Sequence, residues 1–148
     1  MTCIVALPGR VCSDSLDTGS VRRYGPKIFR RHDYLVGTAG SSGLLQRILA
    51  APDWPLELTE AGLATWINRF DGVNSEHGTE LILCTRSDVW IIEGDAVYSS
   101  TQAVAVGSGA AYALGYLEGR PGRLREAVRA ACKHDPYCGG KVTELRVR

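Results

Sequence analysis

The chain has 148 residues, 45% of them hydrophobic, and a formal net charge of +1 at pH 7. This length suits a single domain, residues 1–148, and a chain of this size can bury a hydrophobic core without the help of disulfides or metals. The balanced charge gives no support for a nucleic-acid or membrane partner, and no apolar run approaches the roughly 18 residues of a membrane helix. The apolar start also lacks the basic residues of a signal peptide, so we expect a soluble, cytoplasmic protein.

Cysteine and histidine patterns give no sign of a metal site. The cysteines number five and the histidines three. An odd count without a C-x-x-C pair favours free thiols in a reducing compartment. His32, His77 and His134 show no ligand spacing, so we expect them at the surface, and we expect no metal or cofactor.

The first half of the chain is predicted to form strands and then helices. Apolar runs on both sides of Pro8-Gly9 are typical of a hairpin, and later leucines recur at helical spacing. The predicted strands are 2–7, 10–14 and 34–37, the last followed by a small-residue turn at 37–40. The predicted helices are 44–49, ended by Pro52, and one that starts after the N-cap Thr59 and is closed by Gly72 and Asn74.

The second half is predicted to form a β-rich stretch followed by two helices and a closing strand. Turn residues separate short apolar runs, as in an antiparallel meander. The predicted strands are 81–84, 89–92, 97–98, 103–106 and 141–147. The predicted helices run from Ser108, also a plausible N-cap, to about Glu118, and from near Pro121 to about Cys132. This order indicates a layered α+β fold.

Thr2 is the first candidate for a catalytic residue. If Met1 is removed, as a small second residue generally permits, Thr2 carries a hydroxyl and a free α-amine on one residue. The amine is then a built-in base for its own hydroxyl, which is the N-terminal variant of an activated nucleophile. Cys3 would become the nucleophile only if processing went one residue further.

Five further motifs follow Thr2 in a defined order. They are Ser13-Asp14-Ser15, Gly25-Pro26-Lys27-Ile28-Phe29, Gly37-Thr38-Ala39-Gly40, Gly107-Ser108-Gly109 and Asp135-Pro136-Tyr137-Cys138-Gly139-Gly140. In this order the set resembles the proteasome β-subunit family and its bacterial relative HslV, over nearly the whole chain. The resemblance implies a four-layer α/β/β/α sandwich of the N-terminal-nucleophile hydrolase type.

The resemblance also implies roles for the central residues. Thr2 is the nucleophile, and Lys27 lowers the pKa of the nucleophile or its amine through its positive charge. Asp14 pairs with Lys27 and orients it, whereas Asp17 is a nearby decoy. Gly40 supplies a backbone N–H to the oxyanion.

The family resemblance also implies roles for residues around these central ones. Thr18 binds the backbone of an extended peptide, and Thr38 lies near the floor of the specificity pocket. Ser108 and Asp135 hydrogen-bond around the threonine amine. Cys138 stands where the family usually has serine, and a thiol is the poorer hydrogen-bonding partner.

The resemblance predicts a threonine endopeptidase that assembles into a homo-oligomeric ring or double ring around an internal chamber. Its partners would be unfolded or peptide substrates and an ATPase unfoldase or gating ring. Two alternatives stay open. A non-catalytic structural subunit of the same fold is favoured if Met1 is retained, and an N-terminal-nucleophile amidase would act on small amides.

Overall fold

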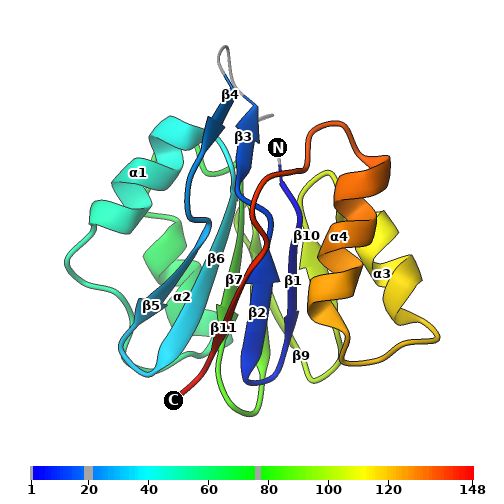
Figure 1. Ribbon diagram of the computed structural model, residues 1–148. Coiled ribbons are helices and arrows are strands. Elements are labelled where there is room, and N and C mark those ends of the chain that lie inside the picture. Colours follow the sequence, from blue (N-terminus) through cyan, green and yellow to red (C-terminus); the bar gives the residue numbers. More distant parts are fainter. Residues whose placement is uncertain (1, 19–21, 76–77) are drawn as a thin grey trace.

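A computed structural model describes residues 2–18, 22–75 and 78–148. Figure 1 shows strands in the middle of the molecule and helices at its two sides. The strands are β1 (Ile4–Leu7), β2 (Arg10–Ser13), β3 (Leu16–Thr18), β4 (Arg22–Tyr24), β5 (Ile28–Arg31), β6 (Tyr34–Gly40), β7 (Thr79–Cys84), β8 (Val89–Glu93), β9 (Ala96–Ser100), β10 (Val104–Val106) and β11 (Thr143–Arg146). The helices are α1 (Ser42–Ala50), α2 (Glu60–Ile67), α3 (Ala110–Leu117) and α4 (Leu124–His134).

The strands form two larger antiparallel sheets and one small hairpin. One sheet has the order β10-β1-β2-β11, and the other has the order β5-β6-β7-β8-β9. Strands β3 and β4 pair with each other and extend beyond the sheets, at the end where Thr2 begins the described chain. The mixed α and β composition expected from the sequence is confirmed.

The two sheets pack face to face. Side chains of β1 and β10, such as Ile4 and Val106, share one buried cluster with Ile82 and Ile91 of the other sheet. At Gly37 the sheets approach so closely that an added Cβ would lie 2.9 Å from Ile4 Cγ2. A glycine therefore permits this approach, because any larger residue must displace a fully buried isoleucine.

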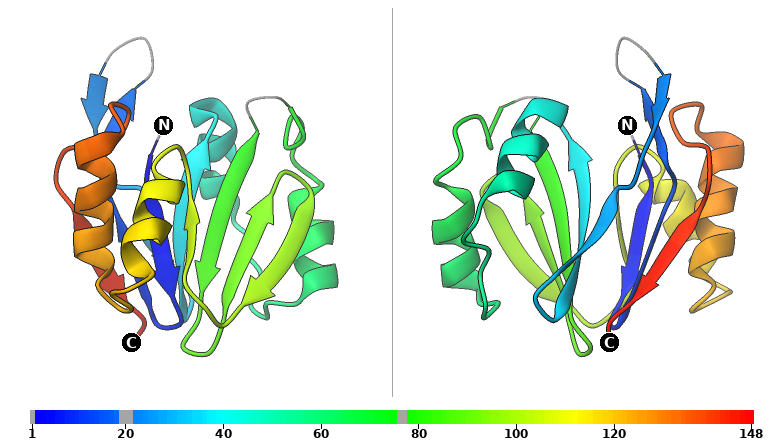
Figure 2. Two further views of the ribbon diagram at one scale, coloured as in Figure 1. Left: turned by 90° about the vertical axis from the view of Figure 1, so that its right-hand side faces the viewer. Right: turned by 60° about the vertical axis from the view of Figure 1, so that its left-hand side comes forward.

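Helices cover the outer face of each sheet (Figure 2). On one side, the apolar faces of α1 and α2 pack with Trp54 against β6, β7 and β8. On the other, α3 and α4 pack against Val5 and Cys12 of β1 and β2. Thr59 caps α2 as predicted, since its Oγ1 accepts a hydrogen bond from Gly62 N. No helix within the described ranges is long and apolar enough to cross a membrane.

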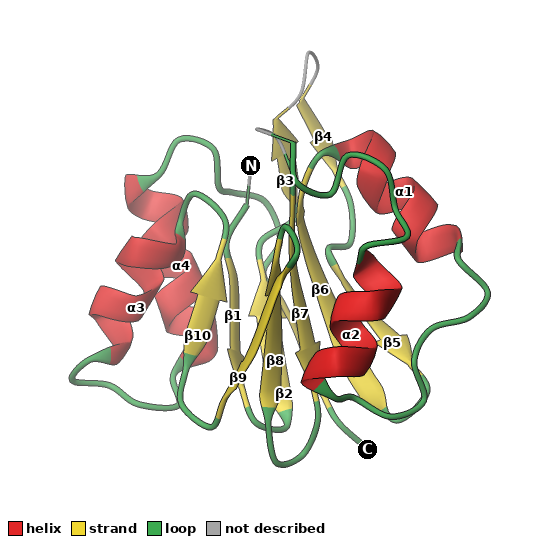
Figure 3. Cartoon of the chain, turned by 180° about the vertical axis from the view of Figure 1, so that it is seen from behind, coloured by secondary structure: helices red, strands yellow, loops and turns green. Residues whose placement is uncertain are grey.

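Several local predictions are wrong (Figure 3). Residues 38–40 continue β6 rather than forming a turn, because they pair with 79–81 of β7. Strand β10 leaves the meander and pairs with β1 instead. The N-cap of α3 is Gly109, not Ser108, and α4 begins at Leu124, three residues after Pro121.

Some features lay outside the sequence predictions or outside the described residues. Strands β3, β4 and β5 were not predicted, because their polar and basic residues do not alternate with apolar ones. His32 and His134 are exposed as expected, and His77 lies outside the described residues.

Candidate active site

Thr2 is buried and lies two residues before the start of β1. Its hydroxyl donates a hydrogen bond of 2.6 Å to Asp14 Oδ1. Its carbonyl oxygen accepts a bond of 3.1 Å from Gly109 N. Gly107, with a φ of +91°, lies so close that an added Cβ would be 2.2 Å from the Thr2 carbonyl oxygen. Both the side chain and the backbone of Thr2 are therefore fixed.

Asp14 follows β2 and is fully enclosed. Its Oδ1 accepts from Thr2 Oγ1, from Cys3 N at 3.1 Å and from Lys27 Nζ at 2.8 Å. Its Oδ2 accepts from Gly139 N at 3.0 Å. Every partner is a donor, so the site is built for a carboxylate and not for a group that must itself donate.

Lys27 comes directly before β5 and brings a positive charge to this site. Its ammonium forms an ion pair with Asp14, and its side chain is only 11% exposed. It also donates to the carbonyl oxygen of Leu16. Since Thr38 N donates to the carbonyl oxygen of Lys27 at 2.9 Å, pairing with β6 holds the lysine backbone in place.

A second group of side chains lies where α4 ends. Asp135 is buried, and its Oδ1 accepts from Tyr137 N at 2.9 Å while its Oδ2 accepts from Cys138 Sγ at 3.2 Å. Burial raises the pKa of Asp135, but hydrogen bonds from Ser108, Tyr137 and Cys138 outweigh it and hold the pKa below its usual value. Ser108 is exposed and lies 3.9 Å from Cys138 Sγ.

Burial raises the pKa of the Cys138 thiol to about 12. Burial also raises the pKa of Cys3, beside Thr2. Both thiols therefore stay protonated near neutral pH, which argues against Cys3 as a nucleophile. Within the described residues, all cysteines are free, and no group of three or more His, Cys, Asp or Glu side chains could hold a metal ion.

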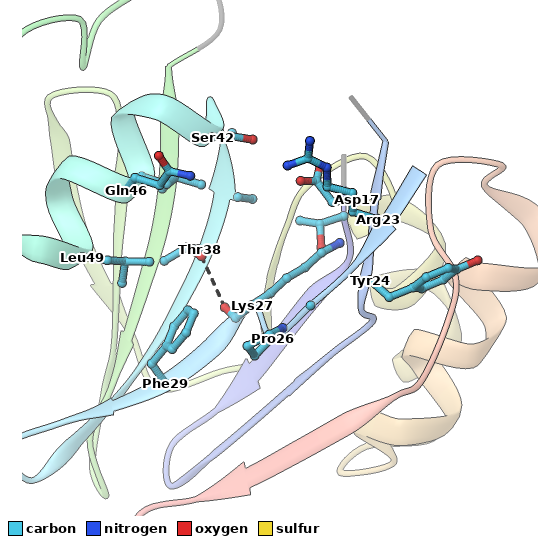
Figure 4. Close-up of a pocket in the computed structure, with 15 residues that line it drawn as sticks. Asp17, Arg23, Tyr24, Pro26, Lys27, Phe29, Thr38, Ser42, Gln46 and Leu49 are labelled. Carbon is cyan, nitrogen blue, oxygen red and sulfur yellow. Dashed lines mark hydrogen bonds between the residues drawn. The ribbon is translucent and has the colours of Figure 1, made fainter. Parts of the chain in front are cut away.

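A hollow of about 300 Å³ opens beside Thr2 and Lys27 (Figure 4). Phe29 of β5, Thr38 of β6 and Leu49 of α1 line its far side. Its mouth carries Asp17 and Arg23 of the β3–β4 hairpin. The interior is mainly apolar, which suits a nonpolar side chain of a ligand.

A wider hollow of about 720 Å³ lies in front of Thr2. Thr18, Gly40, Glu80 and Ser108 are among its lining residues. Gly40 has a φ of +118°, and a Cβ there would lie 2.1 Å from the carbonyl oxygen of Gly78, so no other residue fits. An extended chain crossing both hollows would pass Thr2.

The structure thus brings together Thr2, Asp14 and Lys27, with Thr38 and Gly40 around them. It places Asp135, Cys138 and Ser108 in an adjoining group, and Thr18 at the edge of the wider hollow. Asp14 forms the ion pair with Lys27 Nζ, and Asp17 is among the residues that line the two hollows. Sequence reasoning placed Gly139 in a motif without giving it a role, and it did not single out Glu80. The contacts of both residues are made between segments that are distant in the sequence.

Known structures share this arrangement of the chain. A structure of BPH from Thiobacillus denitrificans in complex with epoxomicin has a TM-score of 0.75 at 23% identity, over 99% of this chain and 98% of that one. HslV from Trypanosoma brucei has a TM-score of 0.67 at 18% identity, over 98% of both chains. The chain has the HslV fold.

This likeness bears out the resemblance read from the sequence. No family profile matches the chain, and no curated protein matches it by sequence. At these identities the HslV fold is shared through the arrangement of strands and helices, while the chemistry must be argued from the side chains above.

Proposed function

We propose that this protein is a threonine-type endopeptidase that cleaves peptide bonds with the Thr2 hydroxyl. The observation that carries the proposal is the buried chain of contacts from Thr2 Oγ1 to Asp14 and from Asp14 to Lys27. Such a buried hydroxyl–carboxylate–ammonium arrangement is costly unless it serves a task. The known structure of BPH in complex with epoxomicin, which has the same fold, adds support.

The reaction begins once Met1 has been removed. Thr2 Oγ1 attacks the carbonyl carbon of the scissile bond, and the free α-amine of Thr2 takes the hydroxyl proton. The Gly40 N–H stabilises the oxyanion, and the charge of Lys27 stabilises the developing negative charge near Thr2. The leaving amine then receives the proton, which leaves a Thr2 ester that water hydrolyses.

Substrate class follows from the two hollows. Thr18 of β3 and Gly40 of β6 both line the wider hollow, where an extended peptide could pair with the backbone of these strands. The smaller hollow, with Thr38 among its lining residues, would accept a nonpolar side chain directly before the scissile bond. Asp135, Cys138 and Ser108 would hydrogen-bond around the Thr2 amine.

On this proposal the packing of helices on two sheets is the four-layer α/β/β/α sandwich of N-terminal-nucleophile hydrolases. The single domain would act within a homo-oligomeric ring in the cytoplasm, with an ATPase or gating ring as partner. The second candidate, a non-catalytic subunit of the same fold, is disfavoured because a scaffold has no need of the buried Asp14–Lys27 pair. An amidase for small amides fits less well, because the two hollows that Thr2 lines, of about 300 and 720 Å³, offer more room than a small amide needs.

The experiment compares the wild type with Thr2→Ala and Thr2→Ser in assays with fluorogenic peptides and with small amides. We expect Thr2→Ala to abolish peptide cleavage and to leave the melting curve largely unchanged, since the hydroxyl makes one hydrogen bond. Thr2→Ser keeps a hydroxyl and should retain activity. Peptide cleavage by Thr2→Ala at the wild-type rate would refute the proposal, and hydrolysis of small amides alone would favour the amidase.

A further inference from the structure

Glu80 is a charged residue in an unfavourable place. It lies on β7, on the same face as Ile82, which packs between the two sheets. Its side chain is half-buried and directly opposite Glu93 of β8. Like charges opposite each other destabilise a sheet, and burial of a carboxylate adds to that cost. A local feature of this kind calls for a compensating contact or a function.

The contact that Glu80 makes leads towards Thr2. Its Oε2 accepts a hydrogen bond of 2.9 Å from Gly107 N, in the turn that follows β10. This bond joins the five-stranded sheet to the four-stranded sheet, which contains β10 and β1. Gly107 directly follows β10, whose last residue, Val106, pairs with Ile4, the first residue of β1 and two residues after Thr2.

The turn held by Glu80 is the one that holds Thr2. Gly107 lies against Thr2, where an added Cβ would be 2.7 Å from Thr2 Cγ2 and 2.2 Å from the Thr2 carbonyl oxygen. Gly109 N donates to the Thr2 carbonyl oxygen. The Thr2 hydroxyl is held separately, by its hydrogen bond to Asp14. A shift of the 107–109 turn would therefore shift the backbone of Thr2 relative to Asp14.

We propose that Glu80 is a positioning residue for the nucleophile, acting through Gly107 to fix the Thr2 hydroxyl and amine relative to Asp14 and Lys27. This inference rests on the proposed function and adds to it a residue that does not touch the reacting atoms. Misplacement of reacting groups by about 1 Å can cost about 100-fold in rate. The reach of the Glu80 side chain, rather than its charge, is what matters.

Three substitutions separate reach from charge. Glu80→Gln keeps an acceptor oxygen at the same length, so its kcat should stay within three-fold of wild type. Glu80→Asp keeps the charge but is one methylene shorter, so its kcat should fall at least ten-fold with KM changed less than two-fold. Glu57→Gln removes the charge of an exposed glutamate that lines neither hollow, and serves as the matched control that stays within two-fold.

The variants are compared by peptide cleavage, by melting curves and by amide hydrogen exchange at Gly107. The Gly107 amide should be protected in wild type and Glu80→Gln, and should exchange faster in Glu80→Asp. A folded Glu80→Asp with wild-type kcat, an equal loss in Glu80→Gln, or rapid Gly107 exchange in wild type would each overturn the inference. Wild type that neither cleaves peptides nor reacts at Thr2 would instead refute the proposed function, and this inference with it.

Discussion

Asp14 makes more hydrogen bonds within the proposed site than any other residue named in it. Its two carboxylate oxygens together accept four hydrogen bonds. Replacing it by asparagine puts an NH₂ group against at least one of those donors and leaves the Lys27 ammonium without its counter-ion. We expect Asp14→Asn to abolish peptide cleavage and to lower the free energy of unfolding by about 3 kcal/mol. Denaturant unfolding and a peptide assay measure the two effects.

Asp17→Asn is the matched comparison for stability. Asp17 is only half-buried and lies in the β3–β4 hairpin, so its unfolding free energy should change by less than about 0.5 kcal/mol. Equal losses of stability in the two variants would contradict the central place given to Asp14.

The cysteines lead to a prediction about pH. Burial raises the pKa of Cys12 and Cys138 to about 12 and that of Cys84 to about 11. A thiol reacts as its thiolate, whose fraction grows only as pH rises towards the pKa. Iodoacetamide at pH 8 should therefore leave Cys12, Cys84 and Cys138 unmodified in the folded protein, and peptide cleavage should survive. Loss of activity together with labelling of Cys3 would point to a cysteine nucleophile instead.

Among the contacts between single residues, the sequence predicted those between residues that are close in the chain or that belong to a recognisable motif. The pairing of Asp14 with Lys27 was expected and is found. The bond from Gly139 N to Asp14 Oδ2 spans 125 positions, and that from Gly107 N to Glu80 spans 27. No local pattern encodes such contacts, because they depend on how two sheets meet.

Among the elements, β6 shows why small residues recur in this chain. Gly37 lets the two sheets approach, whereas Gly115 in α3 has nothing within 4 Å of an added Cβ. We expect Gly37→Ala to destabilise the protein by about 1–3 kcal/mol through overpacking against Ile4. The same change at Gly115 should stabilise it by about 0.5–1 kcal/mol, because alanine is the better helix former. Denaturant unfolding measures the change in the free energy of unfolding for both variants. An unchanged value for Gly37→Ala would contradict the tight contact between the two sheets.

The elements themselves were predictable where a strong apolar period coincided with clear end signals. Helix α2 follows its Thr59 cap, and α4 carries the apolar stripe read from its sequence. Strand β10 was predicted but its partner was wrong, since an apolar run does not specify which sheet it joins. The hairpin β3–β4 was missed because its residues, such as Arg22 and Arg23, are polar on both faces.

On the surface of the whole molecule, several large apolar side chains of the single chain are exposed to solvent. On α3, Tyr112 and Leu114 are 48% and 39% exposed. Under the proposed ring assembly, contacts between copies would bury some of this surface. We expect light scattering to give a mass several times the 16.0 kDa of one chain. A monodisperse monomer at micromolar concentration would contradict a stable ring.

The proposed function requires Thr2 to be a nucleophile with a free amine. The most direct test is the intact mass of the protein before and after treatment with a peptide epoxyketone, a warhead that needs a hydroxyl and a free amine on one residue. We predict a mass without Met1 and one added inhibitor per chain, mapped to Thr2. Retention of Met1 with no adduct would contradict the claim and favour a non-catalytic subunit.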